Sequence, residues 1–172
     1  MTVDPTLASE IVALFGVASR SFLAYVVETS TPSISGEGDE RLHALLVELR
    51  KKERVLEDRC RALIEEAGLR PSAPPFALST SYFNFVRPET SARRFLLEAE
   101  EESVRLRALE KRLSAGEDVG GKLKRLAGDM SASRKAAIEA VQTALQPTEI
   151  PAPLPKAAET PPKTPTAAGG KA

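Results

Sequence analysis

The sequence predicts an all-α fold: a four-helix bundle over residues 1–146 and a disordered tail over residues 147–172. Three observations predict it. Leu, Ala, Glu, Arg and Lys, which are good helix formers, dominate the composition. Apolar residues recur every three or four positions over four long stretches, which is the period of an α-helix. Alternating runs of Val, Ile and Thr, which are typical of strands, are missing from the sequence.

Composition and charge exclude several classes of protein. The 172 residues are 42% hydrophobic, which suffices for one core. The 24 basic and 24 acidic residues cancel, so no basic excess points to a nucleic-acid partner. The single cysteine, Cys60, cannot form an internal disulfide, which is typical of a reducing compartment.

The N-terminal region lacks the features of a signal peptide. Its first basic residue is Arg20, and its apolar run over residues 11–18 is too short to span a bilayer. We therefore expect a cytoplasmic protein with no membrane partner.

The first helix is predicted over residues 4–29. Asp4 can cap the free amides of its first turn, and Pro5 fits the first helical position. The Pro-, Ser- and Gly-containing stretch over residues 31–38 then predicts a loop. The inward stripe of this helix comprises Leu7, Ile11, Leu14, Ala18, Phe22 and Tyr25.

The second helix is predicted over residues 37–67, which is about 45 Å at 1.5 Å per residue. Gly68 is a natural C-cap. Two ion pairs four residues apart are expected on the outer face: Glu48 with Lys52, and Glu57 with Arg61. The inward stripe comprises Leu42, Leu45, Leu46, Leu49, Glu53, Leu56, Cys60, Leu63 and Ile64.

A Pro-rich connection is predicted over residues 68–78. A short helical segment over residues 79–87 should then lead into the third helix with a kink at Pro88. The third helix should continue to about residue 114, and Gly116 ends it. Its inward stripe comprises Ala92, Phe95, Ala99, Glu102, Leu106, Leu109 and Leu113.

The fourth helix is predicted over residues 118–146, because Pro147 ends it. Its inward stripe comprises Leu123, Leu126, Met130, Ser133, Ala137, Val141 and Ala144. The Pro/Ala/Lys-rich tail that follows contains seven of the thirteen prolines and almost no large apolar residue. It is expected to be solvated, with a docking peptide as the alternative.

Glu53 is the most informative residue, because a carboxylate on an apolar stripe needs a partner. Metal-binding four-helix bundles place a Glu-x-x-His pair at such a position. Here Leu56 stands three residues after Glu53, and the only histidine, His43, lies almost three turns away. The sequence therefore outlines a bundle without completing a catalytic metal site.

The order of short, long and short connections resembles the ferritin-like family. Two stretches are similar to bacterial ferritin-like and rubrerythrin-like proteins: SRSFLAYVVE at residues 19–28, and LLVELRKKERVLEDRCRALIEEAGLRP at residues 45–71. The similarity covers roughly residues 6–146. It implies a ferritin-like four-helix bundle with one long crossover.

The resemblance also implies where the di-iron ligands of that family would stand. Glu53 and Glu102 match, which is two of the six positions in the family pattern. The remaining positions carry other residues: Ala18 or Phe22 in the first helix, Leu56 in the second, and Met130 and Ser133 in the fourth. The resemblance therefore implies a member that has lost its metal.

Two interpretations of Glu53 and Glu102 stay open. They could form a remnant acidic pair that shares a proton or binds a cation such as iron or manganese. Alternatively, the two side chains reach solvent or pair with neighbouring Arg or Lys residues, which is the interpretation that we favour.

The other singled-out residues favour ordinary roles. His43 is expected at the boundary of the core rather than as a metal ligand. Cys60 is expected to be a small core residue rather than a redox thiol. The aromatic cluster of Phe76, Tyr82, Phe83 and Phe85 is expected to pack on the core, with a docking surface as the alternative.

The sequence favours a structural or protein-interaction role over an enzyme, with no intact metal site. A protein partner or self-association through amphipathic helices is expected, as in a helical adaptor. The alternative is a di-metal-carboxylate oxidoreductase or iron-handling protein. Its site would combine Glu53 and Glu102 with carboxylates such as Glu28, Glu98 or Asp129.

Overall fold

The computed structural model describes residues 5–70, 82–113 and 119–146. These residues form five helices and no strand, which confirms the all-α prediction. The helices are α1 (Pro5–Ser19), α2 (Phe22–Glu28), α3 (Glu37–Glu66), α4 (Pro88–Arg112) and α5 (Val119–Ala144). The predicted tail, Phe76 and most of the predicted connection over residues 68–78 lie outside the described residues.

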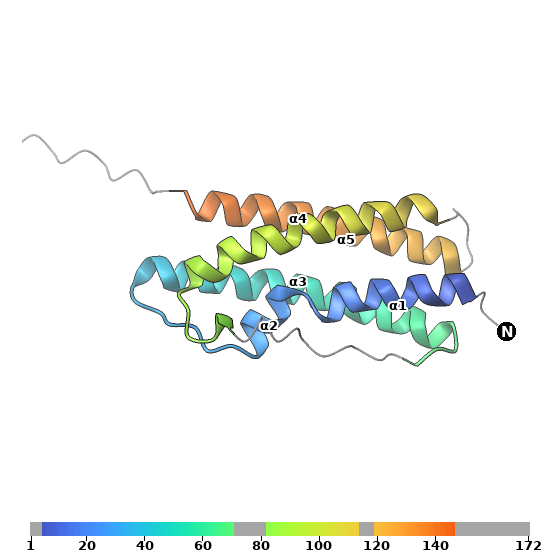
Figure 1. Cartoon of the computed structure of the whole chain (residues 1–172), viewed down its shortest axis with the longest axis horizontal. Helices are drawn as coiled ribbons and strands as arrows, with labels where there is room; N and C mark the ends of the chain where they lie inside the picture. Colours follow the sequence, from blue (N-terminus) through green and yellow to red (C-terminus); the bar gives the residue numbers. More distant parts are fainter. Residues whose placement is uncertain (1–4, 71–81, 114–118, 147–172) are drawn as a thin grey trace, which may run out of the picture.

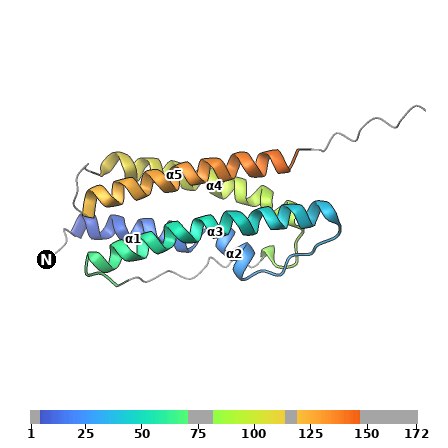
Figure 2. The same ribbon diagram turned by 180° about the vertical axis from the view of Figure 1, so that it is seen from behind.

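The long helices lie side by side, and α3 and α4 run in the same direction (Figure 1). Arg87 before α4 pairs with Asp39 at the start of α3, at 3.1 Å. Lys122 near the start of α5 pairs with Glu66 at the end of α3, at 2.5 Å, so α5 runs antiparallel to α3. Figure 2 shows α3 and α5 adjacent on the rear face. The end of α3 and the start of α4 therefore lie at opposite ends of the bundle.

The first helix is not continuous as predicted, because it breaks between α1 and α2 with a bend of 40°. The hydroxyl of Ser19 donates to the carbonyl of Phe15 at 2.8 Å. The hydroxyl of Ser21 accepts from the amide of Ala24 at 3.1 Å and so caps α2. Serine side chains that bond to nearby backbone compete with the helical ladder, which explains the break between these two serines.

The kink predicted at Pro88 is also wrong. Pro88 is the first residue of α4, where its fixed φ is suitable and its missing N–H is not needed. Residues 82–83 form a 3₁₀ turn instead of an α-helical segment. The amide of Phe85 donates to the carbonyl of Thr31 at 2.9 Å, which ties this turn to the α2–α3 loop.

The second and fourth predicted helices are confirmed to within two residues at each end, as α3 and α5. Gly68 has a φ of 70°, the left-handed conformation that a glycine C-cap supplies without strain. Its amide donates to the carbonyl of Glu65 at 2.9 Å. On α3, Glu57 pairs with Arg61 as expected, although the Glu57 side chain is only 13% exposed, and Glu48 pairs with Lys51 rather than with Lys52.

Buried apolar side chains form two clusters along the bundle. The cluster near α1 includes Ile11, Leu14, Phe15, Ala18, Cys60, Leu63, Ile64, Leu106, Leu109, Leu123, Leu126 and Met130. The cluster near α2 includes Phe22, Leu23, Tyr25, Val26, Leu42, Leu46, Leu49, Ala92, Phe95, Ala99, Ala137 and Val141. The predicted inward stripes supply most of both clusters, whereas Ala144 is exposed.

The aromatic residues that follow the connection differ in burial. Phe83 packs on the cluster near α2 and meets the ring of Phe22 edge-on, with centroids 4.9 Å apart. Tyr82 and Phe85 are 82% and 74% exposed. The prediction of core packing is therefore confirmed for Phe83 and wrong for Tyr82 and Phe85.

Within the described ranges, no single helix is long and apolar enough to cross a membrane. Residues 8–19 and 22–28 pass that test only as a bent pair, by length and composition. Many of their apolar side chains belong to the two buried clusters.

Candidate functional site: a buried charged layer

A layer of polar and charged side chains separates the two apolar clusters. We call it the charged layer, and it comprises Ser21, Arg50, Glu53, Glu102 and Arg134. On each helix the layer lies between residues of the two clusters. On α4, for example, Glu102 lies between Ala99 of the cluster near α2 and Leu106 of the cluster near α1.

Arg134 lies at the centre of the layer and joins two helices to α5. Its Nη1 is 2.5 Å from Oε1 of Glu53 on α3, and its Nη2 is 2.7 Å from Oε2 of Glu102 on α4. The Arg134 side chain is only 5% exposed, and its guanidinium lies 5.7 Å from the centroid of the Phe95 ring. Oε1 of Glu53 receives no well-aligned hydrogen bond, so its contact with Arg134 is an ion pair rather than a directed bond.

Arg50 makes a second, wider set of contacts on the α2 side of Glu53. Its Nη1 donates to Oε2 of Glu53 at 3.2 Å, its Nε to Glu28 at 2.7 Å, and its Nη2 to Glu57 at 2.8 Å. Burial alone would lower the pKa of Arg50, but its hydrogen bonds to Glu28 and Glu57 outweigh burial and raise that pKa. Arg50 therefore stays charged.

Ser21 completes the partners of Glu53. Its hydroxyl donates to Oε2 of Glu53 at 2.6 Å while it accepts the capping bond from Ala24. The break between α1 and α2 places this hydroxyl inside the bundle. Oε2 of Glu53 therefore accepts two hydrogen bonds, from a hydroxyl and a guanidinium, while Oε1 has its ion pair with Arg134.

Glu102 is held differently from Glu53. Its side chain is 13% exposed, and it forms an ion pair with Arg134. Burial raises the pKa of Glu102 to about 7, and the charges of Glu53 and Glu98 act in the same direction, although Arg134 opposes them. Glu102 therefore changes charge near neutral pH, directly beside a fixed guanidinium.

The residues present do not fit a di-iron site. The two carboxylates that match the family pattern contact one guanidinium, which is itself a cation and cannot ligate a metal. His43 is half-buried and ten residues before Glu53 on α3, about 15 Å along the helix. In the part of the chain that the structure describes, no three His, Cys, Asp or Glu side chains are grouped to hold a metal ion.

The other carboxylates considered for such a site are also paired with arginines. Glu28 lies 2.7 Å from Arg50, Asp129 lies 2.7 Å from Arg59, and Glu98 contacts Arg94. Cys60 is fully buried. Burial, with a smaller effect of Glu57, raises the pKa of its thiol to about 12, so the thiol is an inert core group at neutral pH.

Sequence reasoning missed Arg134, Arg50 and Ser21. The periodicity contains one usable signal, because Met130, Arg134, Ala137 and Val141 follow the helical repeat as closely as the predicted stripe through Ser133 does. A charged residue in that register is a candidate partner for Glu53. The sequence does not predict the break before Ser21, because Ser19, Arg20 and Ser21 are polar residues that also occur within helices.

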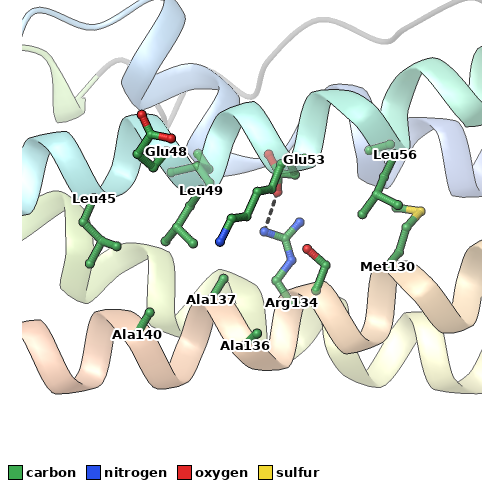
Figure 3. Close-up of a pocket in the computed structure, with 14 residues that line it drawn as sticks. Leu45, Glu48, Leu49, Glu53, Leu56, Met130, Arg134, Ala136, Ala137 and Ala140 are labelled. Carbon is green, nitrogen blue, oxygen red and sulfur yellow. Dashed lines mark ion pairs between the residues drawn. The ribbon is translucent and has the colours of Figure 1, made fainter.

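A slot of about 270 Å³ opens beside the charged layer, between α3 and α5. Figure 3 shows its walls, with Leu45 and Leu49 of α3 facing Ala137 and Ala140 of α5. Glu53 and Arg134 lie further along the slot. The layer can thus be reached from the surface along an apolar path.

Comparisons of the chain with family models, with curated proteins and with solved structures give no match. A ferritin-like origin therefore stays a proposal, and the charged layer is the feature on which a function can be argued.

Proposed function

We propose that this chain is a ferritin-like bundle that works without a metal and acts structurally or through protein contacts. The carrying observation is Arg134, whose guanidinium lies between Glu53 and Glu102. A fixed cation at this place balances buried carboxylates that would otherwise be costly. It does so permanently, whereas a metal site depends on metal supply.

The directions of the helices support the ferritin-like part of the proposal. α3 and α4 are parallel, while α1 and α5 run against them (Figure 1). A four-helix bundle acquires this arrangement when one long connection crosses its length, as in ferritin-like folds. An up-down-up-down bundle would have α3 and α4 antiparallel.

The exposed aromatic turn supports a role in protein contacts. Tyr82 and Phe85 are largely exposed. Ile34, in the α2–α3 loop to which this turn is hydrogen-bonded, is 43% exposed. Phe85 has a φ of 60°, which is unfavourable for a residue with a side chain. Large exposed aromatic side chains are typical of interface centres rather than of ordinary surface.

The alternative of a di-metal oxidoreductase or iron-handling protein has less support. A metal bound by Glu53 and Glu102 would have to displace Arg134 from both carboxylates. The displaced guanidinium is 5% exposed and would need a new partner in the core. No imidazole stands at the positions where the family pattern has histidines.

Metal analysis tests the proposal. The protein, produced in medium rich in iron and manganese, is measured by elemental analysis beside Glu53→Gln and Glu48→Gln. Glu48 is an exposed carboxylate on the same helix, so it is the matched control. We expect far less than one metal ion per chain in all three, and no ferroxidase activity. Stoichiometric metal in the wild type and in Glu48→Gln that is lost in Glu53→Gln would overturn the proposal.

Solution mass tests the part that concerns protein contacts. Light scattering of the wild type is compared with the double variant Tyr82→Ser/Phe85→Ser, because both side chains are exposed and neither supports the core. If the turn mediates self-association, the wild type has a multiple of the 18.5 kDa chain mass and the variant does not. If the wild type and the double variant form oligomers of equal mass, the aromatic turn does not mediate self-association.

A further inference from the structure

The slot between α3 and α5 is mainly apolar in the half that lies toward the start of α3, where Glu48 is the one acidic residue among the described residues that line it. There Leu45 and Leu49 face Ala137 and Ala140, whose small side chains leave the space open (Figure 3). At the other end Leu56 and Met130 point toward one another. The open half therefore runs along α3 from the charged layer toward Leu45.

Among the described charged side chains that line the slot, every one except Lys52 makes an ion pair. Glu53 is held by Arg50 and Arg134, and Glu48 by Lys51 at 2.6 Å. Lys52 also lines the slot and has no ion-pair partner among the described residues. Of the four charged side chains that line the slot, Glu48, Lys52, Glu53 and Arg134, Lys52 is thus the one whose ammonium has no carboxylate partner among the described residues.

We propose that this slot binds a single-chain carboxylate of roughly eight carbons. Its alkyl chain lies between Leu45 and Leu49 on one side and Ala137 and Ala140 on the other, and its carboxylate pairs with Lys52. Lys52 lies seven positions after Leu45, a rise of roughly 10 Å along the helix, which is close to the length of an extended eight-carbon chain. A volume of about 270 Å³ accommodates a ligand of this size.

The charge pattern selects an anion over a cation. An amine in the same place would meet Lys52, and it would have to compete with two arginines for Glu53 and with Lys51 for Glu48. A carboxylate instead gains the one ammonium that lacks a partner. The ligand also covers apolar surface of the slot without breaking any ion pair of the charged layer.

The apolar walls predict how affinity depends on chain length. Each methylene that leaves water on binding raises affinity roughly fourfold. Affinity should therefore rise from butanoate through hexanoate to octanoate and then level off, because a longer chain extends beyond Leu45 into solvent. Nonspecific adsorption to apolar surface would instead keep rising with length.

Calorimetric titration of the full chain tests the proposal, with each carboxylate kept below the concentration at which it aggregates. Ala140→Leu fills the open half and should abolish octanoate binding. Ala132→Leu is the control, since Ala132 is exposed on the same helix in a different groove. Lys52→Ala should weaken octanoate binding roughly fivefold. Because Lys52 is exposed, this variant folds even if Ala140→Leu is destabilised.

Four results would overturn the inference. They are an absence of saturable octanoate binding, equal binding of octylammonium, unchanged binding in Ala140→Leu that melts like the wild type, and binding only to vesicles of anionic phospholipid. The last result would mean that the positive charge of Lys52 binds an anionic lipid surface rather than a free carboxylate. Selective octanoate binding, lost in Ala140→Leu and retained in Ala132→Leu, supports it.

Discussion

The two apolar clusters and the charged layer between them occupy the same inward faces of the same helices, yet they are specified differently. A cluster position requires only an apolar side chain of suitable volume. A layer position requires one particular group, because Arg134 must reach Glu53 and Glu102 from a third helix. The clusters therefore make the helices associate, and the layer favours one register of α3, α4 and α5.

The energetics of the two regions differ in the same way. Burial of the clusters stabilises the fold in proportion to the apolar area removed from water. An intact buried ion pair contributes little net stability, because the cost of desolvating both charges offsets their attraction. Removal of one partner is costly, because the remaining charge is then buried without compensation. The layer should therefore be sensitive to single substitutions and tolerant of complete replacement.

The largest effect is expected for Arg134→Met, which keeps most of the volume and removes the charge. Glu53 and Glu102 would lose their shared cation, and we expect a loss of about 3–5 kcal/mol of unfolding free energy. Denaturant titration measures it. Arg93→Met is the control, since Arg93 is an exposed arginine in a surface pair and should change stability by less than about 1 kcal/mol.

The triple variant Glu53→Gln/Glu102→Gln/Arg134→Met tests whether the instability of Arg134→Met comes from the unpaired charges of Glu53 and Glu102. If the layer acts mainly through its charges, the triple variant should recover most of the stability lost in Arg134→Met. A triple variant as unstable as Arg134→Met would show that these ion pairs make a net contribution comparable to the clusters.

The clusters are tested by one leucine from each, Leu46→Ala near α2 and Leu106→Ala near α1. Both side chains are 1% exposed, and an emptied leucine site typically costs about 2–5 kcal/mol. Similar losses of unfolding free energy in the two variants would show that the two clusters contribute comparably to stability. A loss below about 0.5 kcal/mol at either site would contradict its place in the core.

These regions also differ in how far the sequence predicted them. The helical period correctly placed Leu42, Leu63, Phe95 and Leu123 inside, because burial of apolar residues at that period is a local property of each helix. It also placed Glu53 inside. Period alone could not supply the partner of Glu53, because Arg134 comes from a helix about eighty residues later, and its distance from Glu53 depends on how α3 and α5 pack.

The break at Ser21 and the start of α4 at Pro88 could not be read from helix propensity. The apolar spacing on both sides of residues 19–21 favours one continuous helix, but the local serine bonds interrupt it and the Ser21 hydroxyl gains a bond to Glu53. Pro88 disfavours an uninterrupted helix, which predicts a kink, but a proline that kinks a helix and one that begins a helix have the same local sequence.

The dependence of stability on pH should come from the Glu102 side of the layer. The pKa of Glu102 is raised from 4.5 to about 7 in the folded protein, so the folded state keeps a proton that the unfolded state releases. The stabilisation is complete below about pH 4.5 and is lost as pH rises through 7. The loss attributable to this group is at most about 3 kcal/mol. Denaturant titrations from pH 4.5 to 8 should show this decline, and Glu102→Gln should flatten it. An unchanged slope in Glu102→Gln would assign the dependence to another group.

The smallest effect concerns the two serines at the break, and it distinguishes a layer residue from its neighbour. Ser21→Ala removes both the cap of α2 and the bond to Glu53, so we expect a loss of about 1–2 kcal/mol. Ser19→Ala is the matched control: Ser19 is also buried at the break, but its hydroxyl bonds only to the carbonyl four residues earlier. Such a bond contributes little, and its removal should be nearly neutral. Thermal melting of the two variants measures the difference. Equal losses would mean that the break depends on packing at this point, and that the contact between Ser21 and Glu53 adds nothing to the layer.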